Sequence, residues 1–345
     1  MSPAPKRINY VAEMIWNGTA KPGITYTGTG RPLTVNEMKD AMVRLYDESN
    51  NANFNVFDEM LSPDFVSYGG AGFQDLVGAQ AFRDLYTQFL TSLPDLHFRV
   101  DQVVAEGNMC GVRGRLSGTH KGNFMGSAPP TGRFISWTGT AIFRFDQNGF
   151  MDARWQEWDG LSVMQQMGVI PAPALPQGTN FAPQPEPIPP ALLERALSHA
   201  VGYSSPVHHK RAMRRLIEEV FNGGNLSIAN DIYHPEATYP SQPDIPVGSE
   251  GIRTILNMYQ RAMPDFHVDV KSMITDGDMV LTWLAQSGTH KGELMGVQPS
   301  GKKVNWGQII IARFEGGKIV ESWSNEDILG LMQQLGVGGD ASSGA

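Results

Sequence analysis

The chain has 345 residues, of which 41% are hydrophobic and 18% charged, and its formal net charge is −8. This composition is typical of a folded, water-soluble protein, and the length leaves room for two domains of ordinary size. The acidic balance argues against nucleic acid or an anionic membrane as a partner. The single cysteine, Cys110, excludes an intramolecular disulfide framework and a cysteine-based metal cluster.

The first 33 residues end in a turn-rich passage from Gly28 to Pro32. We predict that residues 1–33 form an N-terminal arm that packs on the first domain. No apolar run has the length of a membrane span or the pattern of a signal peptide, so we expect a cytoplasmic protein.

The rest of the chain is an internal duplication. The pentapeptide GTHKG at residues 118–122 recurs letter for letter at residues 288–292. A Trp, an Asp four residues later and a Met-Gln-Gln tail recur at nearly the same offset. This spacing indicates a duplicated domain rather than a short-repeat solenoid. We place the two copies at residues 34–170 and 191–338.

Both copies have the same order of predicted elements. Apolar residues at helical spacing open each copy, and a turn and a short helix follow. A longer helix, predicted over residues 78–93 and 248–263, stops before a Pro-Asp pair. The pattern then switches to a period of two, which predicts four strands in the first copy, over residues 97–106, 109–118, 134–145 and 150–157. Helices followed by an antiparallel meander predict an α+β fold whose sheet wraps the helices.

The two copies are separated by a proline-rich segment. Residues 171–190 contain eight prolines, which is too many for a helix or a central strand. We predict an extended, semi-rigid linker there. Residues 339–345 are small or polar and are predicted to form a flexible tail.

The order of short motifs resembles that of the SnoaL-like polyketide cyclase family. In the second copy these motifs are GTHKG, Met295-Gly296, Pro299 to Lys302, Arg313-Phe314, Gly317 to Glu321, Trp323, Asp327 and Gln333 to Gly336. The first copy matches with Pro130 to Arg133 and Arg144-Phe145, but has Gly-Phe-Met at residues 149–151 in place of Gly-Lys-Ile.

The resemblance implies two tandem cone-shaped α+β barrels of the nuclear-transport-factor-2-like superfamily. Sheets of this superfamily commonly pack back to back in dimers. We therefore expect the two copies to pair within the chain as a pseudo-dimer, and a homodimer of chains is a further option. The founding cyclases close a ring by an intramolecular aldol reaction with neither metal nor cofactor, so we expect none here.

The resemblance also shows which residues of this chain stand at the positions of the family's catalytic pair. Its pattern places an acid/base Asp on the last strand, next to a His on the preceding strand. In this chain Gln156 and Ser324 fall at the Asp position, and Ala141 and Ile310 fall at the His position. Neither copy keeps the pair, so any catalysis must use other groups.

One face of the last strand is alike in the two copies. It carries Trp155 and Asp159 in the first copy and Trp323 and Asp327 in the second. The tryptophans fit core or interdomain anchors, with Trp323 a candidate for substrate contact as well. The aspartates fit two interpretations: an acid/base at the barrel mouth, or the N-cap of a short C-terminal helix.

The other face of this strand differs between the copies, and the family pattern turns it toward the pocket. It reads Asp152, Arg154, Gln156 and Trp158 against Val320, Ser322, Ser324 and Glu326. The Arg154 guanidinium could fork onto a carbonyl, carboxylate or phenolate oxygen, or could point to solvent from a strand edge. Trp158 could stack on an aromatic substrate.

Two histidines lie in the repeated pentapeptide. His120 and His290 titrate near neutral pH and are candidate proton carriers. Both copies keep the flanking glycines as well, which favours a role in turn architecture. Tyr68, Tyr239 and Tyr259 are candidate pocket hydroxyls.

These observations define a set of candidate site residues. The candidate catalytic residues are Asp159, His120, Arg154, Glu326, Asp327 and His290. The candidate substrate-binding residues are Trp158, Gln156, Tyr68, Trp323 and Ser324. We expect no metal ligand among them, and we expect the first copy to be the active one.

Three functions fit the sequence. The first is a cofactor-independent acid/base enzyme that acts on a hydrophobic, aromatic carbonyl or ester compound by aldol or retro-aldol change, isomerisation or elimination. An apolar pocket would support this chemistry by raising carboxyl pKa values. The loss of the family pair also fits a non-catalytic binder of small molecules. Hydrolysis of an epoxide or ester is the third.

Overall fold

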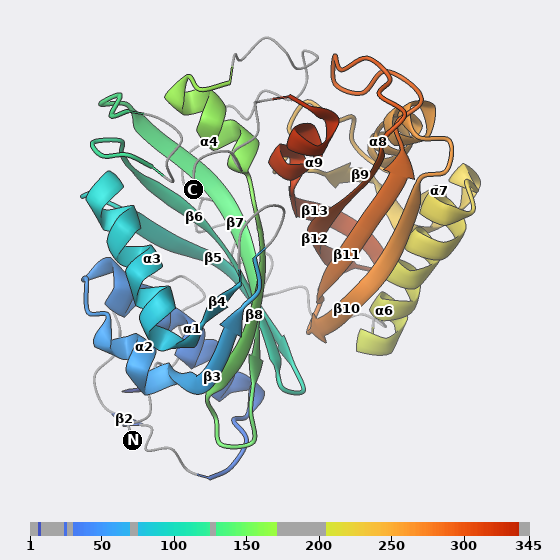
Figure 1. The fold of residues 1–345 in the computed structure, drawn as a ribbon. Helices are drawn as coiled ribbons and strands as arrows, with labels where there is room; N and C mark the ends of the chain where they lie inside the picture. The colour runs from blue at the N-terminus through green and yellow to red at the C-terminus, as the bar shows by residue number, and fades with distance from the viewer. Residues whose placement is uncertain are drawn as a thin grey trace. The chain divides into compact units, whose positions relative to one another are not determined.

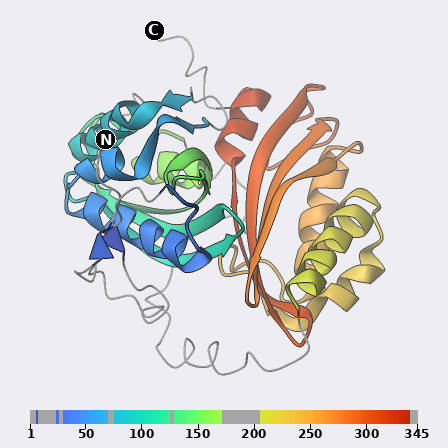
Figure 2. The same ribbon diagram turned by 90° about the horizontal axis from the view of Figure 1, so that it is seen from below.

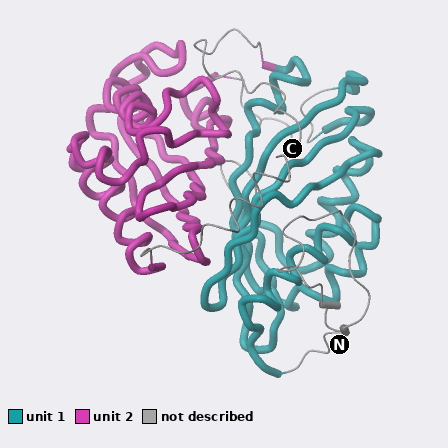
Figure 3. The backbone as a smooth tube through the Cα atoms, turned by 180° about the vertical axis from the view of Figure 1, so that it is seen from behind, with its two compact units in different colours: residues 1–169 teal, residues 170–345 magenta. Residues whose placement is uncertain are grey.

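The computed structural model describes residues 30–69, 75–124, 129–170 and 205–337, together with the backbone of residues 6–7 and 24–25. The chain forms two compact units, Met1–Val169 and Ile170–Ala345 (Figure 3). The predicted linker at 171–190 and tail at 339–345 lie outside the described residues. Of the predicted arm, the backbone at 6–7 and 24–25 forms a two-stranded antiparallel ribbon, β1 and β2.

The first unit consists of helices packed on one sheet. Its elements are α1 (Val35–Asn50), α2 (Asn55–Met60), β3 (Leu61–Ser67), β4 (Leu76–Val77), α3 (Gly78–Ser92), β5 (His97–Glu106), β6 (Met109–Thr119), β7 (Phe134–Phe145), β8 (Met151–Trp158) and α4 (Gly160–Met167). The strand order is β4-β3-β8-β7-β6-β5, and β3 runs parallel to β8 while the other neighbours are antiparallel. Helices α1, α2 and α3 cover one face of this sheet (Figure 1).

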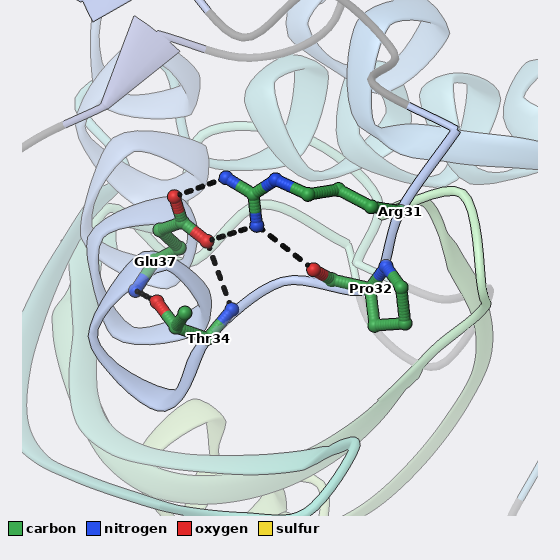
Figure 4. Close-up of polar contacts among 4 residues, drawn as sticks. All are labelled: Arg31, Pro32, Thr34 and Glu37. Carbon is green, nitrogen blue, oxygen red and sulfur yellow. Dashed lines mark hydrogen bonds and ion pairs between the residues drawn. The ribbon is translucent and has the colours of Figure 1, made fainter.

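Helix α1 begins at a fully formed capping box (Figure 4). The Thr34 hydroxyl accepts from the Glu37 amide at 3.3 Å, and the Glu37 carboxylate accepts from the Thr34 amide at 2.8 Å. The Arg31 guanidinium forks onto both Glu37 oxygens at 2.9 and 3.0 Å. These hydrogen bonds, that of Arg31 first, lower the pKa of Glu37 to about 2. Because the cap fixes where the helix starts, it also fixes which face of α1 meets the sheet.

The core of the first unit lies between these helices and the sheet. Met38, Met42 and Leu45 of α1 are fully buried in it. The Tyr46 ring stacks on Phe98 of β5 with ring centroids 3.8 Å apart. Apolar residues at helical spacing therefore supply the helix side of the core, as the sequence pattern predicts.

A bulge near the start of β8 decides which side chains point inward. Arg144 pairs with Ala153, but Phe145 pairs with Met151, so Asp152 is one extra residue in the ladder. The sequence pattern grouped Asp152 with Arg154 on the inward face, but the bulge takes Asp152 out of the alternation, where it accepts from Arg144, and puts Met151 in the core. From Arg154 onward the even-numbered side chains face inward.

The second unit repeats this plan. Its elements are α6 (Pro206–Arg215), the π-helical η3 (Leu216–Asn222), the 3₁₀ turn η4 (Leu226–Ile228), α7 (Ala229–Ile232), β9 (Tyr233–Thr238), α8 (Ser249–Ala262), β10 (His267–Asp276), β11 (Met279–Thr289), β12 (Lys303–Glu315), β13 (Lys318–Glu326) and α9 (Ile328–Leu335). The strand order is β10-β11-β12-β13-β9, with β9 parallel to β13. Helices α6, α7 and α8 stack on one face of the sheet (Figure 2). The same bulge recurs between Arg313 and Phe314.

The predicted α+β class with a sheet packed on helices is confirmed in both units. The predicted strands at 97–106 and 134–145 match β5 and β7 residue for residue. No helix in the described residues is long and apolar enough to cross a membrane. Pairing of the two units as a pseudo-dimer stays a prediction.

Candidate functional site

The first unit encloses a cavity of about 200 Å³ between its helices and the inner face of its sheet. Most of the wall is apolar and aromatic. The aromatic lining residues are Tyr46, Tyr68, Tyr86, Phe89, Phe98, Phe124, Trp137 and Trp158. The polar wall is contributed mainly by Ser67 of β3 and by Arg154 and Gln156 of β8. Such a cavity suits a small aromatic ligand with a few polar groups.

Arg154 is the buried cation of this cavity, with 6% of the residue exposed. Its Nη1 donates to the Ser67 hydroxyl at 2.9 Å, and its Nη2 donates to the Gln156 carbonyl. The Nε–H is enclosed and has no acceptor among the described residues. No carboxylate of the described residues pairs with it, so the guanidinium is held by neutral groups. A buried cation without a counter-ion favours binding of an anion or of a developing oxyanion.

Aromatic rings surround the guanidinium. The Phe82 and Phe143 ring centroids lie 5.1 and 5.7 Å from its central carbon. These distances are typical of cation–π contacts, which stabilise a cation after it leaves water. They do not use its N–H groups, so Nη1 and Nη2 still donate to Ser67 and Gln156.

Two buried tyrosines line the same cavity. Burial raises the pKa of Tyr46 and of Tyr86, and the positive charge of Arg154 offsets part of each rise. Both phenols therefore stay protonated at neutral pH and can act as hydrogen-bond donors. The sequence does not distinguish these two tyrosines, because their spacing on α1 and α3 is that of ordinary core residues.

The two positions at which the family has its catalytic pair are direct neighbours on adjacent strands. Ala141 of β7 and Gln156 of β8 are directly paired, and both line the cavity. The equivalent Ile310 and Ser324 are paired in the second unit. The structure thus brings the expected positions together with side chains that carry no acid or base. Glu157 is the carboxylate among the described lining residues, and it follows Gln156 on the opposite face of β8.

Asp159 and Asp327 are N-caps of the C-terminal helices. Each side chain accepts from the backbone amide three residues later, Ser162 at 3.2 Å and Gly330 at 2.9 Å. Burial raises the pKa of Asp159 to about 7 and that of Asp327 to about 6. Asp159 is not among the residues that line the cavity. The capping interpretation therefore accounts for its recurrence.

His120 and His290 tie one loop to another in both units. The Nδ1 atom of His120 accepts from the Thr131 amide at 3.3 Å and contacts its hydroxyl at 3.0 Å. His290 makes the same contacts to Ser300, at 3.2 and 3.1 Å. Both rings are fully buried, and burial lowers the pKa of His290. These contacts support the interpretation of the repeated histidine as part of the turn architecture.

Trp158 and Tyr68 line the cavity, and Trp155 and Trp323 lie on the other face of their strands. The Trp158 ring contacts Trp137 edge to face, with centroids 6.4 Å apart. Tyr68 stacks on Trp155 at 5.3 Å. Trp323 is buried, and its alternation in β13 sets it opposite to Ser324, away from the inner face.

Glu326 lies at the end of β13 in a polar cluster of the second unit. Its Oε1 accepts from Tyr259, Gln286 and Trp306 at 2.6 to 2.8 Å. Burial raises the pKa of Glu326, against the effect of these hydrogen bonds. Glu326 and Tyr259 were each candidates from the sequence, but without a link between them. Gln286 and Trp306 were not candidates, because no local sequence pattern connects residues on different strands and helices.

The described residues contain no group of three or more His, Cys, Asp or Glu side chains arranged to hold a metal ion. The candidate polar groups are therefore those of the cavity and of the Glu326 cluster.

Several solved structures are similar to parts of the chain. TsrD from Streptomyces laurentii is 25% identical, with a TM-score of 0.37, over 39% of this chain and 98% of its own. AclR from Streptomyces galilaeus is 29% identical, with a TM-score of 0.34, over 38% of this chain and 83% of its own. IdmH from Streptomyces antibioticus is 29% identical, with a TM-score of 0.34, over 37% of this chain and 99% of its own.

A comparison with curated proteins gives no match. The model of the SnoaL-like polyketide cyclase family matches the chain twice, at residues 40–167 and 211–335. One match lies in each compact unit, and together they cover more than half of the chain. The chain thus belongs to the SnoaL-like polyketide cyclase family, with two copies of the family domain in tandem.

Proposed function

We propose that the first unit binds an aromatic carbonyl compound and promotes proton transfer at the carbon next to the carbonyl. The observation that carries this proposal is Arg154: a buried guanidinium on the wall of an aromatic cavity, without a carboxylate partner among the described residues. Family membership supports a cyclase-like role of this kind.

The chemistry follows from the charge of the site. Loss of a proton beside a carbonyl leaves an enolate, whose negative charge sits mainly on oxygen. A fixed cation in an apolar enclosure stabilises that charge more strongly than water does, because the site needs no reorganisation. The phenols of Tyr46 and Tyr86 stay protonated and can donate to the same oxygen.

The proposed substrate is a carbon acid that is already activated. The described lining residues include no carboxylate on the inner face of β8, so the site supplies stabilisation of the oxyanion rather than a strong base. A methylene between two carbonyl groups, attached to an aromatic ring, meets this condition. Aldol or retro-aldol change, isomerisation and elimination all pass through such an enolate.

The test uses benzoylacetone, an uncharged aromatic 1,3-diketone whose enolate absorbs at longer wavelength than its neutral forms. We expect the protein to raise the enolate fraction at fixed pH and to speed deuterium uptake at the central carbon. Arg154→Met should reduce both effects at least tenfold, since one oxyanion donor contributes about 10²–10³-fold in enzymes. Arg154→Lys should keep part of the effect, because it keeps the charge without the fork.

The matched control is Arg144→Met on the neighbouring strand. Arg144 donates to Asp152 at 2.8 Å and does not line the cavity. The Arg144→Met variant should leave the enolate fraction and the rate of deuterium uptake unchanged. Equal loss in the two variants, or no enolate shift with the unchanged protein, would remove the proposed role of Arg154.

The replacement of the family pair by Ala141 and Gln156 favours one alternative, a non-catalytic binder of small aromatic molecules. In that case the diketone would raise the melting temperature, but no deuterium would enter it. An epoxide or ester hydrolase is the third candidate. Oxygen-18 from labelled water appearing in the product would identify it.

A further inference from the structure

The second unit holds a carboxyl group with one oxygen fully occupied and the other open. Glu326 Oε1 accepts from the Tyr259 hydroxyl at 2.7 Å, the Gln286 amide at 2.8 Å and the Trp306 indole N–H at 2.6 Å. These donors come from α8, β11 and β12, so three elements converge on one oxygen atom. All three donor residues are buried, which fixes the plane and direction of the carboxyl group.

The other oxygen, Oε2, is free for a ligand. It receives no hydrogen bond from the described residues, and it is not among their enclosed polar atoms, so solvent reaches it. No Arg, Lys or His of the part that the structure describes forms an ion pair with Glu326. The three neutral donors orient the carboxylate and lower its pKa in part, but no salt bridge from the described residues lowers it further.

The first unit shows that the fold does not need this cluster. The register pairs Gln286 with Trp306 and Gln308 with Glu326, at the positions where the first unit pairs Leu116 with Trp137 and Gly139 with Trp158. The C-cap amide of α8 donates to the backbone carbonyl of Tyr259, and the C-cap amide of α3 donates to that of Phe89. Tyr259 and Phe89 therefore occupy equivalent positions in the two units. Apart from the tryptophan, the second unit is therefore polar where the first is apolar, on the same backbone.

We propose that the second unit carries a separate site, in which Oε2 of Glu326 removes a proton from carbon in an uncharged ligand. This goes beyond the function proposed for the first unit and does not depend on it. An uncharged ligand is inferred because the described surroundings of Glu326 offer no cation to hold an anion. Ser322 and Ser324 lie half-buried on the same face of β13 and can donate to its polar atoms.

The electrostatic surroundings support a proton carrier. Burial raises the pKa of Glu326 above its ordinary value. Two titratable groups of the described residues lie against it: Tyr259 from α8, whose pKa burial also raises, and Asp327, the next residue in the chain. Neither supplies positive charge, so neither offsets the effect of burial, and the ionised carboxylate is a stronger base than an exposed glutamate.

The probe is 5-nitrobenzisoxazole, an uncharged aromatic compound with one acidic C–H bond. In a single step the base takes the proton from C3, the C–H electron pair forms the third bond of a nitrile, and the N–O bond breaks to release a phenolate. Atoms and charge balance with no further reactant. The released 2-cyano-4-nitrophenolate is yellow, so the rate is read by absorbance.

Glu326→Gln is the decisive variant. Its amide oxygen can still accept from all three donors, so the cluster and the fold are kept, while the base is removed. We expect the full-length protein to accelerate the reaction over an equal concentration of acetate, with a rate that rises with pH through the pKa of Glu326 and then levels off. Glu326→Gln should lower the rate at least tenfold, since general bases contribute about 10²–10⁴-fold, with an unchanged melting temperature.

Glu321→Gln is the matched control, because it removes a carboxylate from the same strand, and Glu321 pairs with Arg313 rather than with the Glu326 cluster. It should retain the rate of the unchanged protein. The proposal is overturned if the protein is no faster than acetate, or if Glu326→Gln keeps the full rate. Loss of the rate in Arg154→Met with retention in Glu326→Gln would place the reaction in the first unit and would overturn it as well.

Discussion

At the scale of single residues, Asp159 shows how one side chain can carry two opposing effects. Its carboxyl caps α4 by accepting from Ser162, which stabilises the helix start. Burial penalises the charge of the same carboxyl and raises its pKa to about 7, from 3.8. The start of α4 needs the hydrogen-bond acceptor of this side chain, but it does not need the negative charge.

The sign of the pH effect follows from this shift. Between pH 3.8 and about 7 the folded state holds a proton that the unfolded state has lost. The free energy of unfolding therefore falls as pH rises through this window. Asp327, with a pKa of about 6, adds an effect of the same sign in the second unit.

We predict that Asp159→Asn is as stable as the unchanged protein at about pH 3, below the window, and more stable at pH 8. Asparagine caps as well as aspartate, and it carries no charge to bury. The gain should be about 1–2 kcal/mol, discounted from about 1.4 kcal/mol per pKa unit because the side chain is half-buried. Urea unfolding at both pH values measures it.

Asp159→Ala provides the comparison, since it removes charge and cap together. It should be less stable than Asp159→Asn by about 1 kcal/mol at both pH values. If Asn and Ala behave alike, or if the Asn variant gains nothing at pH 8, the account of this residue is wrong.

Arg154 and Glu326 mark the limit of sequence interpretation at this scale. The residue types and the alternation along the last strand could be read directly. Whether Arg154 met a carboxylate, a hydroxyl or solvent depended on β3 and its Ser67, 87 positions away in the chain. No local pattern contains that information.

At the scale of elements, the repeated pentapeptide builds the corner between the long helix and the sheet. The Asp95 carboxylate accepts from the amide and hydroxyl of Thr119, both at 2.6 Å, and Asp265 does the same for Thr289 at 2.7 and 2.6 Å. The amide of Gly122 donates to the Ser92 carbonyl at the end of α3. The pentapeptide and the Pro-Asp pair therefore recur together because they form one structure.

We predict that Gly122→Ala destabilises the first unit by about 2–3 kcal/mol, in the range of overpacked sites. A Cβ at this position would lie 2.5 Å from the Thr91 carbonyl oxygen, and a backbone atom cannot move aside cheaply. Differential scanning calorimetry would show it as a lower unfolding temperature.

Gly139→Ala is the control for this substitution, because a Cβ there would meet its nearest neighbour at an ordinary 3.4 Å. It should be near neutral. Gly292→Ala should reproduce the loss in the second unit, where the Arg261 carbonyl is closer still. A Gly122→Ala protein as stable as Gly139→Ala would refute the account of the corner.

At the scale of the whole molecule, the duplication has produced two cores. One cluster of buried apolar residues belongs to the first unit and a second cluster to the second. Domains with cores of their own usually unfold as separate cooperative units. Their inner faces have diverged, since the first presents Arg154 to an aromatic cavity and the second presents Glu326.

We predict two unfolding transitions that core substitutions move separately. Leu45→Ala should lower one of them and Leu256→Ala the other, each by about 2–5 kcal/mol, as both side chains are fully buried. Calorimetry of the full chain measures both transitions together. A single transition that both variants lower equally would show that the units unfold as one.

The sequence by itself determined the duplication, the family and the α+β class, because these depend on periodicity and on motifs that are local in the chain. It also listed Arg154, Trp158 and Glu326 on the inward face. Tertiary structure decided what these residues meet, since the cavity and the Glu326 cluster are assembled from strands and helices far apart in sequence. It also supplied the cap contact of Asp159 and the loop contact of His120, because each is defined by the partner that folding brings within hydrogen-bond distance.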